Sequence, residues 1–186
     1  LSLYEGLFSG GARVLHTNVV TALHQDGSHE HAVLSIASRA RREGAVQHIA
    51  DDPRYRWLRD AGVDVTDLGR EAGALPPEPE SFTDAELEVA AAAVGRADVI
   101  LTLKEQPLGL LLALEARGLL PDVPIAACLH RSDPTHSGAA ARWMGELAAS
   151  GRLTTTISCA ESTSDAYARY TPSSVERVVI PNGIDL

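Results

Sequence analysis

The chain of 186 residues is long enough for one α/β domain with a full core, and its 45% apolar and 22% charged residues are ordinary for a globular domain. Its formal net charge of −9 argues against nucleic-acid or anionic-membrane binding over the whole surface. The longest apolar-rich patch, Leu108 to Leu114, is far too short to span a membrane, and no signal-peptide pattern follows Leu1. We therefore expect a cytoplasmic protein with no transmembrane segment.

Strand and helix patterns alternate through the first part of the chain. A short first strand is expected at Leu1 to Tyr4, and apolar residues at helical spacing predict a helix from Ala12 that stops at Gly27. The next predicted segments are a strand at 31–37, a helix at 54–62, a strand at 63–68 and a proline-rich surface loop at 69–81.

The second part of the chain continues the alternation. Thr83 and Glu86 have the spacing of a capping box, which predicts the start of an alanine-rich helix that runs to Ala97. The pattern then predicts strands at 99–103, 125–129, 154–159 and 175–180, and helices at 107–117, 139–149 and 162–170. Strands separated by helices imply right-handed crossovers. We therefore predict an α/β fold with a single doubly wound parallel sheet of about seven strands and helices on both faces.

Ligands of such sheets bind at the carboxyl ends of the strands. This rule selects six loops as candidate binding segments. They are 5–11, 38–44, 104–106, 130–136, 161–163 and 182–183.

The pair Gly10-Gly11 lies between the first predicted strand and the first predicted helix. Glycines there let a ligand approach the backbone, and the free N–H groups of a helix start favour an anion such as a diphosphate. The pair is neither the three-glycine dinucleotide fingerprint nor a P-loop, so a plain tight turn is the alternative.

Three polar residues follow neighbouring predicted strands. His130 closes the strand at 125–129, where an imidazole can donate to a substrate hydroxyl or to charge that develops on a leaving phosphate. The alternative is a histidine that only satisfies a loop carbonyl. Lys104, the one lysine beside 15 arginines, and Glu105 end the strand at 99–103. They indicate either a site for a polar substrate or a solvated ion pair.

Two further groups of polar residues have weaker patterns. Arg39, Arg41 and Arg42 follow the strand at 31–37 and have the chemistry to clamp a phosphate or carboxylate, although a solvated helix start is the alternative. His29 and His31 form a His-x-His pair without a third ligand, at the amino end of a strand. We therefore expect no metal site.

The glycine pair and the terminal run Val-Ile-Pro-Asn-Gly-Ile-Asp, preceded by Ile157 to Ser162, together resemble the amino-terminal domain of family 4 retaining glycosyltransferases, which have the GT-B architecture. The resemblance implies that backbone N–H groups at Gly10, Gly11 and Ala12 bind the donor diphosphate and that His130 is catalytic, near the reacting sugar. It also implies acceptor-side positions and an interdomain hinge. The acceptor-side candidates are Glu5, Lys104, Glu105 and Arg131, and the hinge residues are Pro181, Asn182 and Gly183.

The resemblance further implies a Rossmann-like domain at 1–180, a hinge that begins at 181–186, and a carboxyl-terminal donor domain in cis that is absent from the chain. The whole protein would move a hexose from a nucleotide-sugar to the hydroxyl of a sugar, lipid-linked or small-molecule acceptor with retention. It would need no permanently bound cofactor and no metal, and this piece alone would be inactive. Two alternatives are another GT-B enzyme, such as a nucleotide-sugar epimerase or a phosphorylase, and a non-catalytic sugar- or nucleotide-binding module.

Overall fold

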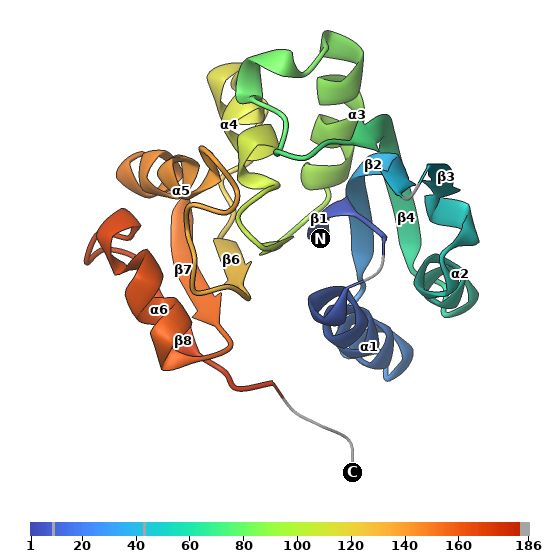
Figure 1. Ribbon diagram of the computed structural model, residues 1–186, viewed down its shortest axis with the longest axis horizontal. Helices are drawn as coiled ribbons and strands as arrows, with labels where there is room; N and C mark the ends of the chain where they lie inside the picture. Colours follow the sequence, from blue (N-terminus) through green and yellow to red (C-terminus); the bar gives the residue numbers. More distant parts are fainter. Residues whose placement is uncertain (9, 43, 183–186) are drawn as a thin grey trace.

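The computed structural model describes residues 1–8, 10–42 and 44–182 and shows an α/β fold around one sheet (Figure 1). In space the strands run β3-β2-β1-β5-β6-β7-β8, and β4 pairs with β2. Among the described strands, every pair is parallel except β2 with β3. The strands are β1 (Ser2–Gly6), β2 (Ala32–Arg42), β3 (Ala45–His48), β4 (Asp64–Ala72), β5 (Ile100–Leu103), β6 (Ile125–Leu129), β7 (Leu153–Ser158) and β8 (Glu176–Val179).

Six α-helices and three short 3-10 turns connect the strands in the described part of the chain. The helices are α1 (Gly11–Gln25), α2 (Pro53–Asp60), α3 (Asp84–Val94), α4 (Leu108–Ala116), α5 (Ala140–Ala149) and α6 (Glu161–Tyr167). The 3-10 turns are η1 (Ile49–Asp51), η2 (Pro79–Ser81) and η3 (Ala168–Tyr170). Not one helix among the described residues combines the length and the apolar character needed to cross a membrane.

The core divides between the two faces of the sheet. Successive side chains of a strand point to opposite faces, and in β1 the fully buried Leu3 and Tyr4 belong to different apolar clusters. The cluster of Leu3 includes residues of α3, α4, α5 and α6, whereas the cluster of Tyr4 includes residues of α1 and α2. Figure 1 shows α1 and α2 together on one side, away from α3 and α4. The predicted fold class, a doubly wound Rossmann-like α/β domain, is confirmed.

Several helix ends follow from local chemistry. The capping box at the start of α3 is confirmed, because Thr83 Oγ1 accepts from the N–H of Glu86 at 3.3 Å and Glu86 Oε2 accepts from the N–H of Thr83 at 2.7 Å. After α1 the chain turns at Gly27, whose φ of 73° favours glycine. These ends were predicted within two residues from the sequence, except that α3 stops at Val94 and not at Ala97.

The prediction of a loop at 38–44 is wrong. Strand β2 continues to Arg42. Its pairing with β1 ends at Ala37, and beyond that point residues 39–42 pair with β3 in an antiparallel hairpin. On the other edge of β2, strand β4 continues to Ala72, so 69–72 is strand and not surface loop. The extension is stabilised across the strands, because both Arg39 and Arg41 form ion pairs with Glu71 of β4 at 3.3 and 3.6 Å. The sheet therefore has eight strands, one of them antiparallel.

Candidate functional site

The carboxyl ends of β1, β5 and β6 lie side by side in the middle of the sheet. They carry Glu5 near the end of β1, Lys104 and Glu105 directly after β5, and His130 directly after β6. The structure therefore brings four of the residues predicted from the sequence to one edge of the sheet. Arg131 follows His130 and is exposed at the same edge.

The glycine turn between β1 and α1 holds Gly10 and Gly11. Gly10 is the N-cap of α1, and its carbonyl accepts from the N–H groups of Arg13 at 3.1 Å and Val14 at 3.2 Å. No side chain of the described residues caps this helix, and its first turn contains no acidic residue. Its positive end is therefore available to an anion at Gly11 and Ala12. A Cβ built on Gly11 meets no described atom within 4 Å, so the described residues leave the space beside this glycine open.

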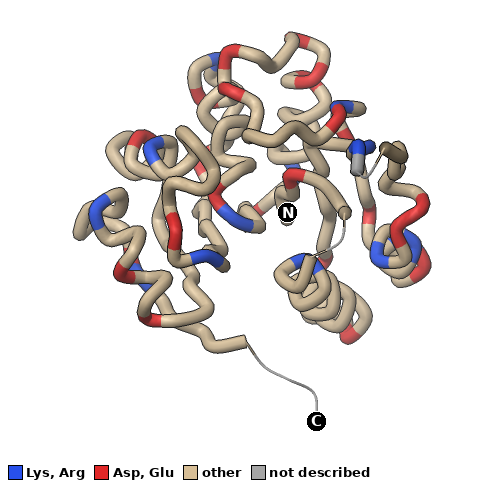
Figure 2. The backbone as a smooth tube through the Cα atoms, viewed as in Figure 1, with Lys and Arg blue, Asp and Glu red and all other residues tan. Residues whose placement is uncertain are grey.

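Arg13 fixes the glycine turn, and its role was missed from the sequence. The side chain is only 8% exposed. Its Nη1 donates to the carbonyl oxygen of Phe8 at 2.8 Å, and its Nη2 lies 3.4 Å from Oε2 of Glu5. A guanidinium held on both sides orders the loop and pairs the Glu5 carboxylate. Figure 2 shows that α1 carries no acidic residue along its length.

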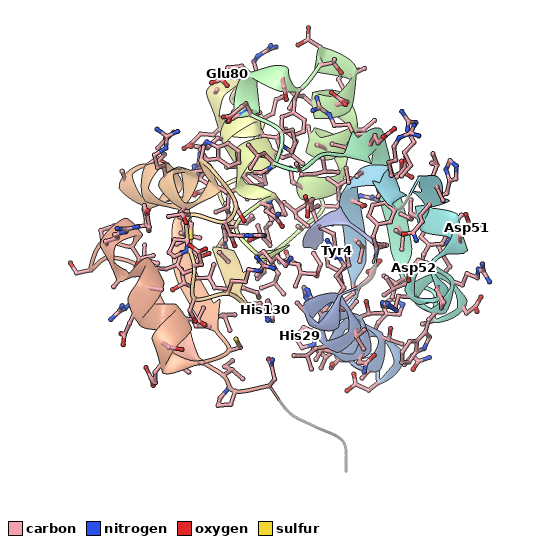
Figure 3. The ribbon with its side chains drawn as sticks, viewed as in Figure 1. Tyr4, His29, Asp51, Asp52, Glu80 and His130 are labelled. Carbon is pink, nitrogen blue, oxygen red and sulfur yellow. The ribbon has the colours of Figure 1, made fainter. Side chains whose placement is uncertain are left out.

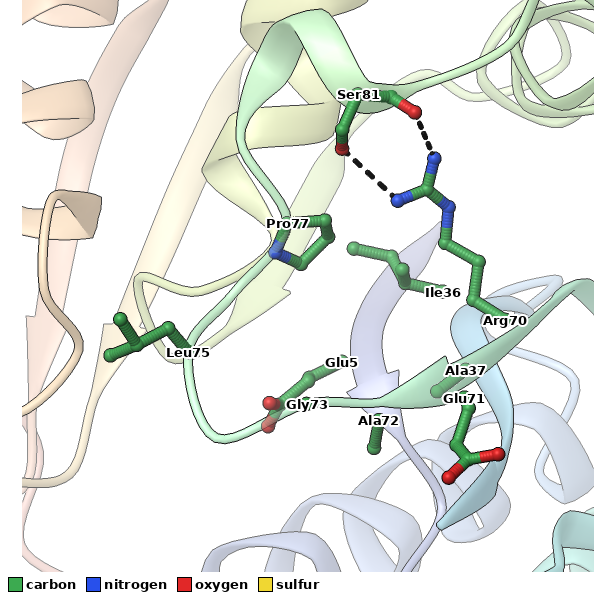
Figure 4. Close-up of a pocket in the computed structure, with 10 residues that line it drawn as sticks. All are labelled: Glu5, Ile36, Ala37, Arg70, Glu71, Ala72, Gly73, Leu75, Pro77 and Ser81. Atoms are coloured by element: carbon green, nitrogen blue, oxygen red, sulfur yellow. Dashed lines mark hydrogen bonds between the residues drawn. The ribbon is translucent and has the colours of Figure 1, made fainter.

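A first cavity of about 280 Å³ lies at the carboxyl ends of β1 and β4, beside the middle of β2 (Figure 4). The loop that follows β4 forms its other wall, with Gly73, Leu75 and Pro77. Figure 4 shows the Glu5 carboxylate beside Gly73 in this cavity. Sequence reasoning misses this cavity, because the pattern at 69–81 predicts a proline-rich surface loop. The prolines directly after the end of a strand were the available signal.

The rim of the first cavity is held by Arg70. Its Nε and Nη2 donate to the two carboxylate oxygens of Glu86 at 2.6 and 2.8 Å, and its Nη1 donates to Ser81 Oγ at 3.1 Å. Hydrogen bonds with Arg70 hold the pKa of the Glu86 carboxyl at about 2, despite some burial, and bonds from Thr83 act in the same direction. The capping box of α3 and the cavity rim are therefore one network.

A second cavity of about 310 Å³ lies between α1 and the ends of β5, β6 and β7. It is lined by His16 and His130 among apolar side chains, and the segment Ile180 to Asn182 closes one side. Figure 3 shows His130 on the side of β6 that faces α1. Val19 of α1 and Ile180 are 46% and 56% exposed at its border, so the cavity is apolar and open.

The two histidines of the second cavity are neutral at pH 7. Burial lowers the pKa of His130, and the positive charge of Lys104 lowers it further. Burial lowers the pKa of His16 to about 4, with a smaller contribution from His130. Burial also raises the pKa of the Cys128 thiol to about 11, which leaves it protonated and unreactive. The cavity thus offers neutral imidazoles that can donate or accept hydrogen bonds.

Other predicted residues lie apart from these cavities or outside the description. Arg39 and Arg41 are strand residues paired with Glu71, so they do not form a phosphate-clamping loop. Pro181 and Asn182 are exposed and follow β8, whereas Gly183 lies outside the described residues. No cluster of three or more metal-ligating side chains occurs among residues 1–8, 10–42 and 44–182.

Comparison with known proteins gives a structural match but no sequence match. No family model and no curated protein matches the chain. The structure of Anabaena Alr3699/HepE in complex with UDP matches with a TM-score of 0.66 at 15% identity, over 99% of this chain and 44% of that one. Structures of the same protein with UDP and glucose, and with UDP-glucose, match with a TM-score of 0.65 at 16% and 14% identity.

The chain has the fold of one Rossmann-like half of a GT-B protein. It spans less than half the length of the HepE chain that it matches. The likeness extends over essentially all described elements, because 99% of this chain is covered. At this level of identity the match establishes the fold alone.

Proposed function

We propose that this chain is the acceptor-side half of a retaining glycosyltransferase of family 4, which moves a hexose from a nucleotide-sugar to an acceptor hydroxyl. The observation that carries the proposal is the match of the whole chain to part of HepE, which was solved with UDP, with UDP and glucose, and with UDP-glucose. The open glycine turn at the carboxyl end of β1 supports the same assignment.

In this proposal the glycine turn binds the donor diphosphate. The N–H groups of Gly11 and Ala12 stand at the uncapped, positive end of α1, where a leaving nucleotide gains negative charge as the bond to the sugar breaks. Because no described atom fills the space beside Gly11, phosphate oxygens can approach the backbone closely. Arg13 and its bond to Phe8 keep the turn in this shape before the donor binds.

His130 hydrogen-bonds a hydroxyl of the transferred sugar. Its neutral imidazole adds no charge to the sugar, and its half-buried position in the second cavity excludes part of the solvent around the reacting carbon. The first cavity takes the acceptor, with Glu5 as a hydrogen-bond acceptor for its hydroxyl groups. Retention follows from attack on the face that the leaving phosphate occupies, with a phosphate oxygen accepting the hydroxyl proton.

The donor contacts that complete the site belong, in the same proposal, to a second domain reached through Pro181 and Asn182. Support comes from the 44% coverage of HepE and from the exposed Ile180 where the described chain leaves the sheet. The domain at 1–180 then shapes the acceptor side, and this piece alone does not catalyse sugar transfer. No metal takes part, because the positive end of α1 and the hydrogen bond from His130 stabilise the charge that develops.

The test is sugar transfer by the full-length protein. We expect release of the nucleoside diphosphate from at least one member of a nucleotide-sugar panel that includes UDP-glucose, with a product that keeps the anomeric configuration of the donor. Epimerised donor or phosphate-dependent cleavage would instead assign another GT-B enzyme, and binding without turnover would assign a non-catalytic module.

A further inference from the structure

Lys104 directly follows β5 at the carboxyl edge of the sheet. Strand β5 runs between β1 and β6 in the sheet. Glu5 of β1 lines the first cavity, and His130 after β6 lines the second. Lys104 therefore follows the strand that separates the end of β1, which lines the first cavity, from the end of β6, which lines the second.

The backbone at Lys104 is held in an unfavourable conformation. Its φ of 71° is the one positive value for a non-glycine residue in the described part of the chain. Thr102 Oγ1 donates to the carbonyl oxygen of Lys104 at 2.8 Å, and the N–H of Lys104 donates to the carbonyl of Cys128 at 2.8 Å. Such a conformation disfavours residues with a Cβ, and glycine would adopt it freely. A lysine here indicates a need for its side chain.

The ammonium group of Lys104 is half-buried and has no hydrogen bond or ion pair to any described residue. A cation that loses part of its hydration is ordinarily compensated by a carboxylate. Burial lowers its pKa, and the nearby Arg13 lowers it further. The nearest carboxylate of β1, Glu5, is already paired with Arg13. The group is therefore placed for a partner that is not part of the described chain.

The charges around Lys104 define the partner as an anion. The cations that act on it are Arg13 and Arg131, and the carboxylates are Glu5 and Glu105. Three cations against two carboxylates make this edge locally positive in a chain of net charge −9. A ligand group with negative oxygens fits this balance, whereas a cationic one does not.

The segment that follows Lys104 also holds a buried polar atom that the described chain leaves without a partner. It is Oε1 of Gln106, two residues after Lys104. A buried polar atom without a partner is uncommon in folded proteins and indicates a bound group or water. Its position beside the strained residue supports a segment shaped for a ligand.

We propose that Lys104 binds an oxyanion of the substrate, a phosphate or a carboxylate, at the carboxyl edge of the sheet. The proposal rests on the proposed function for the identity of that substrate. The oxyanion has two possible sources, the diphosphate of the nucleotide-sugar or an acid group on the acceptor. A positive side chain is required, so Arg in place of Lys keeps binding in part and an uncharged, unbranched side chain such as that of Met does not.

The test compares Lys104→Met and Lys104→Arg with the wild type in the full-length protein, with Arg142→Met as a control that removes an exposed arginine from α5. Calorimetry measures the dissociation constants of four probes, which are inorganic pyrophosphate, UDP, glucuronate and glucose. Tenfold weaker pyrophosphate and UDP binding in Lys104→Met identifies the donor diphosphate as the source. Tenfold weaker glucuronate binding, with glucose unchanged, identifies an acid group on the acceptor. Recovery in Lys104→Arg supports either assignment.

The proposal is overturned if Lys104→Met changes every dissociation constant by less than twofold, or if glucose binding falls as much as that of the anions. A second measurement uses the single lysine of these 186 residues. In an NMR spectrum of protein labelled with ε-¹³C-lysine, the Lys104 signal is the one that is missing from Lys104→Arg. Its chemical shift must change when pyrophosphate or glucuronate is added, and the change must saturate with the dissociation constant that calorimetry gives. Sugar transfer that is intact in Lys104→Met refutes this inference alone. Lys104-dependent pyrophosphate binding without any sugar transfer refutes the proposed function alone.

Discussion

A single added methyl group at Gly11 separates a binding role of the glycine turn from a structural one. A Cβ at this position meets no described atom within 4 Å, and Gly11 is the first residue of α1. Alanine there loses less backbone entropy than glycine, so Gly11→Ala should raise the free energy of unfolding by up to about 1 kcal/mol. For a chain of this size that corresponds to an increase of roughly 2–4 °C in Tm.

The same methyl group occupies the space through which a phosphate would reach the N–H groups of Gly11 and Ala12. Losing a hydrogen bond to a charged group costs about 1.5–3 kcal/mol, so we expect UDP binding to the full-length protein to weaken by at least about tenfold in Gly11→Ala. The loss should be greater in Gly11→Val, whose side chain is larger. Calorimetric titration with UDP measures the binding, and thermal unfolding measures the stability.

Gly145 supplies the matched control. It lies inside α5, and a Cβ there would be in ordinary contact with the carbonyl oxygen of Tyr170 at 3.5 Å. Gly145→Ala should therefore stabilise the fold by about 1 kcal/mol and leave UDP binding unchanged. The reasoning is refuted if Gly11→Val is stable and binds UDP as tightly as the wild type. It is equally refuted if Gly145→Ala weakens UDP binding as much as Gly11→Ala.

Three further predictions concern the histidines and the cavity rim. His130→Ala should lower kcat/KM for sugar transfer by about 10²–10³-fold without changing Tm, and His130→Gln should lose less because it keeps a donor, as steady-state rates would show. Glu86→Gln should lower the free energy of unfolding at pH 7 by about 1–2 kcal/mol, after allowance for solvent screening. Because the pKa of Glu86 is lowered to about 2, its contribution is complete above about pH 5 and should disappear as the pH falls toward 2 in denaturant titrations. The pKa of His16 is also lowered, to about 4, so as the pH falls the unfolded chain binds a proton at His16 before the folded chain does. Stability should fall between about pH 6.5 and 4, and His16→Gln should reduce that fall.

Local signals in the sequence predicted the parts of the fold that depend on neighbouring residues. The capping box of Thr83 and Glu86 is satisfied within one turn of α3, so no distant contact can override it. The order of strands and helices placed Lys104, Glu105 and His130 at one edge, because the carboxyl ends of parallel strands meet there.

The hairpin of β2 and β3 could not be predicted in the same way. Arg39 and Arg41 look like loop residues. All four side chains of β3 are exposed, so its sequence lacks the alternation of apolar and polar residues that predicts a strand. Their strand conformation depends on Glu71, which is 30 or more positions away in the sequence and pairs with both arginines. Long-range pairing of this kind leaves no period in the sequence.

The missed site residues have the same physical origin. Arg13 follows the glycine pair and looks like one more surface arginine, yet it is buried because Glu5 and the Phe8 carbonyl receive its guanidinium. His16 has no motif around it, and its place in the second cavity depends on the packing of α1 over the sheet, where its Nε2 lies 3.4 Å from Ser2 Oγ of β1. Burial of a charged or polar side chain is a tertiary property, and composition does not reveal it.

The most direct test of the proposed function follows the anomeric protons by ¹H NMR while the full-length protein acts on a panel of nucleotide-sugars with a range of sugar acceptors. The account predicts that one donor is consumed, that the nucleoside diphosphate is released, and that the new glycoside has the donor's anomeric configuration. Gly11→Val should abolish this signal while the protein stays folded. A product of inverted configuration, or no consumption of any donor by the folded full-length protein, would contradict the account.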